Sequence, residues 1–412
     1  MRPTILIATT STWFPTARLA MALAHAGCVV DAVCPAGHPL GQIKAVRKTY
    51  HHRGLMALQS FADAIAATHP DFIIPGDDLA TTHLHRLYDR EQRRGESGRA
   101  VCALIERSLG SRESFPIVYE RTAFMELARQ AGIRAPKTEV ISNLAEVRSW
   151  VSRVGLPTVL KANGTSGGMG VRVVYTLEEA EQAFQALQSP PLFIRAVKRA
   201  LIDHDRTLVW PSFLRRRSVV NAQEFVNGRE ATSAVACWHG SILASLDFEV
   251  LHKRDSAGPS SVLRLIDNAE MSAAAAAMAA RLNLSGLHGF DFMLEAHTGV
   301  AHLIEINPRA TQIGHLRLGP GHDLPAALYA ALAGESVRPS PRITTNDTIA
   351  LFPQEWLRDP KSPFLRSAYN DVPWEEPELV RACIRKLRQQ GVFTFDEPNP
   401  LHTLSAARLP RL

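Results

Sequence analysis

The stretch GFDFMLEAHTGVAHLIEINPR, Gly289 to Arg309, decides the fold predicted for this chain. Two apolar segments flank His297-Thr298-Gly299, a sequence typical of a tight turn between two paired strands. Side chains alternate along a strand with a period of two, so Glu305 and Asn307 share one face. Asp291 can lie beside them on the paired strand.

Two carboxylates and an amide oxygen on one rigid surface form an oxygen-only site, which favours Mg²⁺. Arg309 follows this face directly, and its guanidinium can bind a phosphate or a carboxylate through paired donors. The alternative is an antiparallel hairpin whose polar face is simply solvated.

A second motif places Lys161 at the end of a strand, before a loop that contains four glycines. Gly164, Gly167, Gly168 and Gly170 permit positive φ and close backbone approach, so successive N–H groups can bind phosphate oxygens. The lysine precedes the glycines, and no Gly-Lys-Ser/Thr follows, so this is not a Walker A loop. A flexible hairpin is the alternative.

These segments resemble the ATP-grasp superfamily, which includes carboxylate–amine ligases and biotin carboxylase-like enzymes. The resemblance implies ATP and Mg²⁺ as cofactors, with Mn²⁺ as a substitute metal. It implies Asp291, Glu305 and Asn307 as metal ligands, and Arg309 and Lys161 as catalytic residues close to the transferred phosphate.

The resemblance also assigns nucleotide contacts along the chain. Arg121 stands where the family usually has lysine, and a surface salt bridge is its alternative role. The segment after Gln223 resembles the hinge that binds adenine, and Glu230 would hold the ribose; a strand–turn–strand with polar ends is the alternative. The implied nucleotide-binding residues are Arg121, Lys161, Gly167, Gly168, Met169, Gly170, Glu224, Phe225, Val226 and Glu230.

Two further residues, His315 and Arg317, are candidates for binding a substrate carboxylate, although a lone histidine is more often structural. Near the N-terminus, the resemblance implies that Thr9–Thr12 and Gly76–Asp78 face the acceptor site. For Asp77 and Asp78 a helix N-cap is an equal alternative.

Alternating strands and helices up to residue 74 predict an open parallel α/β sheet. No G-x-G-x-x-G follows its first strand, so a dinucleotide site there is not expected. The predicted fold class is therefore α/β, an ATP-grasp fold preceded by a Rossmann-like domain. The expected parts are residues 1–113, an ATP-grasp domain at 114–340 with a lid at about 135–222, and a C-terminal appendage at 341–412.

Smaller signals complete the expected secondary structure. Asn143 and Thr176 each precede a glutamate by three residues, the pattern of a capping box. The charged run Arg90–Arg99 is expected to be a solvated loop or helix end, and Leu251–Arg264 a loop.

Composition limits the class of protein. The chain has 412 residues, 46% of them hydrophobic, and a net charge of +6, which suits anionic small-molecule substrates better than nucleic acid. The basic stretch 195–217 is either a solvated face or a surface for an acidic substrate or a partner subunit. No apolar run reaches the roughly 20 residues that cross a bilayer, and the start MRPTILIATT resembles a first strand more than a signal peptide. The chain has five scattered cysteines and no C-x-x-C pair, which is unremarkable in a reducing cytosol. A cytoplasmic location is expected.

The implied reaction is ATP-dependent ligation. A carboxylate is activated as an acyl phosphate and coupled to an amine, with amino acids or a small natural-product acid as substrates. A homodimer is expected from the resemblance alone. The rivals are carboxylation through carboxyphosphate, a protein that binds ATP without chemistry, and, more weakly, a basic protein associated with nucleic acid.

Overall fold

The computed structural model describes residues 2–163, 170–188, 218–255, 258–338 and 340–389. The chain divides into two compact units, residues 1–249 with 266–343, and residues 250–265 with 344–412. Among the described residues, no helix is long and apolar enough to cross a membrane. The division into three domains expected from the sequence stays a prediction.

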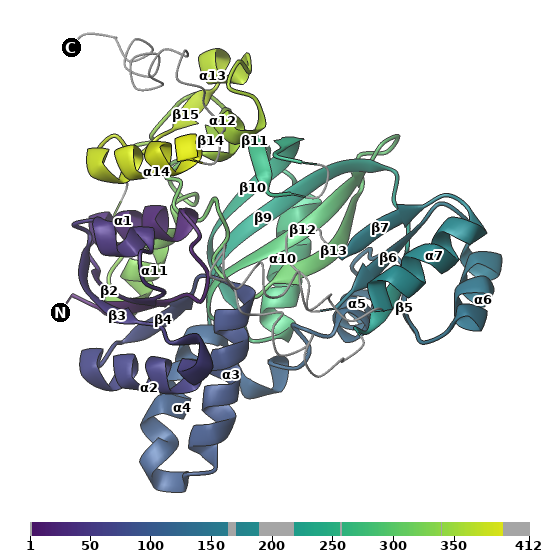
Figure 1. The fold of residues 1–412 in the computed structure, drawn as a ribbon. Coiled ribbons are helices and arrows are strands. Elements are labelled where there is room, and N and C mark those ends of the chain that lie inside the picture. The colour runs from purple at the N-terminus through teal and green to yellow at the C-terminus, as the bar shows by residue number, and fades with distance from the viewer. Residues whose placement is uncertain (1, 164–169, 189–217, 256–257, 339, 390–412) are drawn as a thin grey trace. The chain divides into compact units, whose positions relative to one another are not determined.

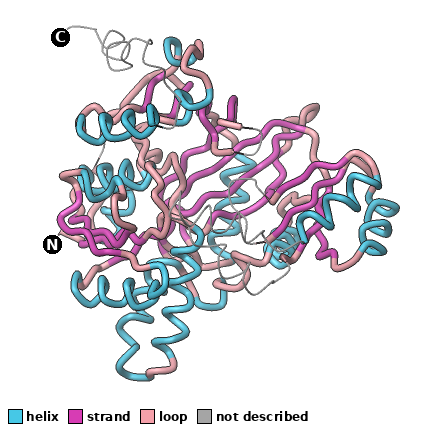
Figure 2. The backbone as a smooth tube through the Cα atoms, viewed as in Figure 1, coloured by secondary structure: helices cyan, strands magenta, loops and turns pink. Residues whose placement is uncertain are grey.

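The N-terminal part of the first unit is a four-stranded parallel sheet in the order β3-β2-β1-β4 (Figure 1). Leu6 and Ala8 of β1 lie in one hydrophobic cluster with Phe61, Leu84 and Ile105 from the three helices that cover this face (Figure 2). The elements are β1 (Thr4–Ala8), α1 (Pro15–Ala26), β2 (Val29–Cys34), η1 (Pro39–Gln42), β3 (Val46–His51), η2 (Gly54–Met56), α2 (Ala57–Thr68), β4 (Phe72–Pro75), α3 (Asp78–Gln92), η3 (Gly95–Gly98), α4 (Arg99–Leu109) and η4 (Arg112–Ser114).

This part confirms the predicted parallel sheet and its first two helices. The charged run Arg90–Arg99 contains the end of α3 and the short helix η3, and it leads into α4. Strand β3 and helix α4 were not predicted from the sequence.

The segment predicted to be the lid contains a four-stranded antiparallel sheet in the order β5-β8-β6-β7. Trp150 is fully buried under it and donates a hydrogen bond from Nε1 to Thr158 Oγ1 at 2.7 Å. The Thr158 hydroxyl in turn donates to Gln223 O at 2.9 Å, so one chain of bonds joins a helix to two strands. The elements are β5 (Thr138–Ile141), α6 (Leu144–Val154), β6 (Thr158–Ala162), β7 (Val171–Val174), α7 (Leu177–Gln188) and β8 (Val220–Glu224).

The rest of the first unit is an antiparallel sheet in the order β13-β12-β9-β10. Phe290 and Phe292 of β12 are buried against α5 and α10 on one face, and each such burial stabilises the fold by roughly 2 kcal/mol. The elements are α5 (Arg121–Gln130), β9 (Gly228–Trp238), β10 (Ser241–Lys253), α10 (Ala269–Arg281), β12 (Gly286–Glu295), β13 (Ala301–Asn307) and α11 (Leu324–Ala333).

The second unit is built from two distant parts of the sequence. Strand β11 pairs antiparallel with β14, which pairs parallel with β15. The predicted loop Leu251–Arg264 is wrong at both ends, because β10 extends to Lys253 and β11 begins at Ser260. The elements are β11 (Ser260–Leu265), β14 (Thr348–Leu351), α12 (Gln354–Arg358), α13 (Phe364–Ser367), β15 (Tyr369–Asp371) and α14 (Pro377–Gln389).

Candidate active site

The hairpin of β12 and β13 brings the three predicted metal ligands together. Asp291 lies opposite Glu305, and Gly289 lies opposite Asn307. The pairing shifts after Asp291, so β13 carries one extra residue there, and such a bulge changes the direction of nearby side chains. Because Phe290 and Phe292 face the hydrophobic cluster, Asp291 between them is directed to the other face.

Hydrogen bonds hold Asp291 in place. Thr232 on β9 donates from its hydroxyl to Asp291 Oδ1 at 2.8 Å, and Asn307 Nδ2 donates to Oδ2 at 2.9 Å. Burial, together with the negative charge of Glu305, raises the pKa of Asp291 to about 6. The two carboxylates are therefore close enough to repel each other.

Two cations face the carboxylate of Glu305. Arg121, the first residue of α5, donates from Nη2 to Glu305 Oε2 at 2.8 Å. The side chain of Arg121 is only 16% exposed and that of Glu305 is 32% exposed, so this ion pair is partly buried. Burial acts to raise the pKa of Glu305, but the charges of Lys161 and Arg121 outweigh burial and hold this pKa below its ordinary value.

Lys161 is the last residue but one of β6 and is 6% exposed. Burial lowers the pKa of its ammonium group to about 8, and the carboxylate of Glu305 opposes that shift. Lys161 is thus mainly protonated at neutral pH, with a positive charge inside the protein. The charges of Arg121, Asp291 and Glu230 also affect the pKa of Lys161. These three groups and Glu305 therefore all lie close enough to Lys161 to interact with it electrostatically.

This group of side chains fits a divalent cation and a polyphosphate. The repulsion between the two carboxylates is what a bound cation would relieve, and Mg²⁺ completes its octahedral shell with waters and phosphate oxygens. The described residues include no group of three or more His, Cys, Asp or Glu arranged to hold a metal ion. The predicted donor set has only two such residues, Asp291 and Glu305, with the amide of Asn307 as the third ligand. Arg121 Nη1 is buried with no hydrogen-bond partner among the described residues, which suits an incoming anion.

The predicted hinge follows β8. Glu224 ends this strand and is exposed, and its carboxylate accepts a bond from Lys137 N at 3.3 Å. Phe225 and Val226 are half-buried. Gln223 instead is buried and donates to Thr138 Oγ1 at 3.0 Å, so its side chain serves the lid's interior.

Glu230 lies on β9, two residues before Thr232, so the two side chains share one face of the strand. Thr232 is the residue that donates to Asp291. In the loop after β6, Gly170 accepts a backbone bond from Ala162 at 2.8 Å. The other predicted loop residues, Gly164, Gly167, Gly168 and Met169, lie outside the described residues, as does the basic stretch 195–217.

The two substrate candidates lie after the hairpin. His315 is buried, at 7% exposure. Arg317 contacts His25 at the end of α1, with 2.6 Å between Nη1 and Nε2. Their role in binding a carboxylate stays a prediction.

Asp77 has a structural role. It is the N-cap of α3, and its carboxylate accepts a bond from Ala80 N at 2.8 Å. The same carboxylate accepts bonds from Thr9, Thr10 and Ser11, so it fixes the loop after β1. The capping alternative therefore holds for Asp77.

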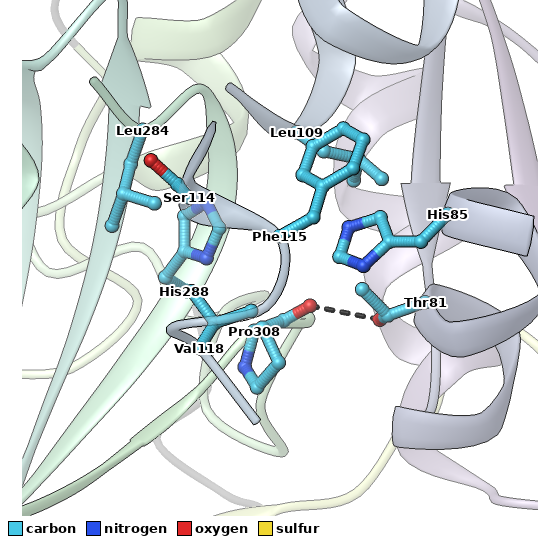
Figure 3. Close-up of a pocket in the computed structure, with 9 residues that line it drawn as sticks. All are labelled: Thr81, His85, Leu109, Ser114, Phe115, Val118, Leu284, His288 and Pro308. Atoms are coloured by element: carbon cyan, nitrogen blue, oxygen red, sulfur yellow. Dashed lines mark hydrogen bonds between the residues drawn. The ribbon is translucent and has the colours of Figure 1, made fainter. Parts of the chain in front are cut away.

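A small cavity lies beside the hairpin (Figure 3). Thr81 on α3 donates to Pro308 O at 2.8 Å across it. His85 stacks on Phe115 with ring centroids 3.7 Å apart. Burial lowers the pKa of His85 to about 3 and the pKa of His288 to about 4, so both rings are neutral.

Sequence comparisons match two segments of the chain to known families. Residues 210–312 match the ATP-grasp domain, and residues 120–203 match the ATP-binding domain of the carbamoyl-phosphate synthase L chain. The carbamoyl phosphate synthase large chain of Pasteurella multocida is 22% identical over 232 residues, which are 55% of this chain and 20% of that protein. The chain thus spans about a fifth of the length of this relative.

Solved structures share the fold. N5-carboxyaminoimidazole synthase of Aspergillus clavatus, in complex with ADP and 5-aminoimidazole ribonucleotide, superposes with a TM-score of 0.58 at 15% identity, covering 82% of this chain and 78% of that one. The biotin carboxylase domain of Hydrogenobacter thermophilus 2-oxoglutarate carboxylase, with MgADP, ADP and bicarbonate, gives 0.57 at 14% identity, covering 82% and 71%. At these identities the likeness establishes the fold, including its N-terminal α/β part.

Proposed function

Because this chain belongs to the ATP-grasp superfamily, by the sequence of its ATP-grasp domain and by its fold, we propose that it is an ATP-dependent ligase. It activates a small-molecule carboxylate as an acyl phosphate and couples it to an amine. The observation that supports this most directly is the cluster of Lys161 and Arg121 around Glu305, beside Asp291.

The chain's own groups supply charge and position. Lys161 and Arg121 bring two positive charges to the place where the nucleotide phosphates are proposed to lie, and Glu224 with Glu230 would hold the nucleoside. Asp291, Glu305 and Asn307 would hold Mg²⁺, which neutralises phosphate charge when bound. Catalysis then rests on positioning and electrostatics.

Arg309 is proposed to bind the anionic reactant. The carboxylate oxygen attacks the γ-phosphorus and the bond to the β-phosphate oxygen breaks, which releases ADP. An amine then attacks the acyl carbon and phosphate leaves, with the amine proton passing to solvent or phosphate. Neither step needs a nucleophile from the protein.

The test is release of ADP and phosphate from MgATP across a panel of amino acids and small carboxylic acids. We expect release that requires both an acid and an amine, and a loss of at least about 100-fold in Glu305→Ala, as expected when a charge-stabilising group is removed. Glu295→Ala is the matched control, because Glu295 lies on the same hairpin but bonds Thr298 in the turn.

The panel also separates the rivals. Release that needs bicarbonate in place of an amine would replace ligation with carboxylation. Tight ATP binding without turnover on any substrate would indicate a protein that binds nucleotide without chemistry.

We further expect EDTA to abolish the release of ADP and phosphate, and both Mg²⁺ and Mn²⁺ to restore it, since both are hard cations that oxygen ligands bind.

A further inference from the structure

The segment after β13 is fastened to the N-terminal part of the first unit through its backbone. Ala310 N donates to Pro75 O, at the end of β4, at 3.1 Å. Thr81 Oγ1, on the first turn of α3, donates to Pro308 O at 2.8 Å (Figure 3). Two bonds on either side of Arg309 therefore fix its backbone against this strand and helix.

The Arg309 guanidinium is fixed as well. Its Nε donates to Asp78 Oδ1 at 3.0 Å, Nη1 to Ala310 O at 3.2 Å and Nη2 to Asn307 Oδ1 at 3.2 Å. The ring of Trp13 lies 5.2 Å from the guanidinium carbon, within the range of a cation–π contact. An arginine has five N–H donors, and two of those of Arg309 bond to no residue that the structure describes.

Both contacts from the N-terminal part are themselves anchored. Asp78 is the first residue of α3, where the helix dipole favours a negative charge. The carbonyl of Trp13 accepts a bond from the Thr16 hydroxyl at 2.6 Å, which fixes the loop that carries the indole. Arg309 is 15% exposed and Asp78 is 38% exposed, so the pair is partly shielded from water.

We propose that Asp78 and Trp13 are positioning residues that hold the Arg309 guanidinium in one orientation, so that its two remaining donors are ready for an anionic reactant. This proposal rests on the proposed ligase function. Donors that are oriented in advance need not reorganise during the reaction. The N-terminal part of the chain thereby takes part in phosphoryl transfer without touching a reacting atom.

The first test is kinetic. We expect Asp78→Ala to lower kcat by about 10- to 100-fold, with KM for ATP changed less than about threefold, because misplacing a group that acts in the transition state affects turnover more than binding. Asp78→Glu should recover part of the loss. Trp13→Leu should lower kcat by a few fold, and Trp13→Phe should recover most of it.

Asp89→Ala is the matched control, because Asp89 lies on the same helix and pairs only weakly with the exposed Arg112, at 3.5 Å. It should keep the wild-type kcat. Wild-type kcat in Asp78→Ala, or an equal loss in Asp89→Ala, would overturn the proposal while leaving the ligase function intact.

The second test does not require activity. In protein labelled with [¹⁵N]arginine, the Nε–Hε signal that disappears in Arg309→Lys belongs to Arg309. We expect this signal to be sharp and slow to exchange in the wild type, and broadened or lost in Asp78→Ala but not in Asp89→Ala. An unchanged signal in Asp78→Ala would refute the positioning role, even if no substrate for the enzyme had been found.

Discussion

At the scale of single residues, burial and charge act against each other in the candidate site. Lys161 keeps a proton at neutral pH although burial lowers its pKa to about 8, since Glu305 and Asp291 are close. The protein therefore maintains a buried positive charge at a cost in stability. Such a cost is expected where the charge is used.

Replacing this lysine separates activity from stability. We expect Lys161→Met to lower kcat for ADP release by about 100-fold or more, while the midpoint of urea unfolding changes little, because Arg121 still pairs with Glu305 after the buried ammonium is removed. Lys361→Met, at an exposed position of the second unit, is the control. A variant that unfolds more easily and retains its activity would show that Lys161 serves the fold.

Alkaline pH should act on the same group. The folded-state pKa of about 8 lies below the ordinary 10.5, so the ammonium loses its proton as pH rises through 8. We expect kcat/KM for ATP, which reports the free enzyme, to fall above about pH 8 in the wild type. Lys161→Arg, if active, should remain flat to higher pH because a guanidinium keeps its proton. A flat wild-type profile up to pH 10 would contradict this.

Some residues of the candidate site can be predicted from the sequence, and others cannot. Alternation along two strands was enough to place Asp291, Glu305 and Asn307 together, and family resemblance added the assigned roles. The partners Thr232, on a third strand, and Asp78, which is 231 residues from Arg309, have no local signal. Such contacts depend on tertiary packing, which no window of sequence contains.

At the scale of elements, the sequence predicts features that depend only on neighbouring residues, such as helix caps. Asn143 Oδ1 accepts from Glu146 N at 3.0 Å, so the predicted N-cap is confirmed. The return bond of the predicted capping box is displaced by one residue, because Glu146 Oε2 accepts from Ser142 N at 2.8 Å. The missed strand β3, Val46–His51, is mostly exposed and lacks apolar alternation. The pairing of β11 with β14, more than 80 residues later in the chain, has no signal within the sequence of β11 itself.

The cap of α6 gives a stability test for the lid. Asn143→Ala removes the acceptor for Glu146 N, and we expect a loss of about 1 kcal/mol in the free energy of unfolding. Asn143→Asp or Asn143→Ser should restore most of it, because both side chains also accept at an N-cap. Urea unfolding followed by circular dichroism measures the difference. Equal stabilities of the wild type and Asn143→Ala would contradict the role of the cap.

At the scale of the whole molecule, buried neutral histidines make stability depend on pH. His85 and His288 have folded-state pKa values of about 3 and 4, below the ordinary 6.5, because burial disfavours their charged forms. As pH falls, these histidines take up protons in the unfolded chain before they do so in the folded protein. The folded state is therefore most stable above pH 6.5, and it loses this stability as pH falls towards the folded-state pKa values. Each ring should contribute a loss of about 2 kcal/mol by pH 5.

Urea unfolding at pH 7.5, 6 and 5 measures this loss. We expect the stability of His85→Leu to fall less steeply with acid than that of the wild type, by about 2 kcal/mol over this range. His297→Leu, at an exposed position in the hairpin turn, serves as the control. Parallel slopes for wild type and His85→Leu would contradict the prediction.

Strand β11 has a practical consequence for anyone who shortens this chain. It is encoded in the middle of the sequence, yet its partner β14 lies after residue 343, and Val262 and Leu263 in it are completely buried. Truncation at Ile343 would leave an unpaired strand edge with two uncovered apolar side chains, which is a template for aggregation. A shortened protein would therefore need Val250–Leu265 replaced by a short polar turn, so the two segments must be removed or kept together.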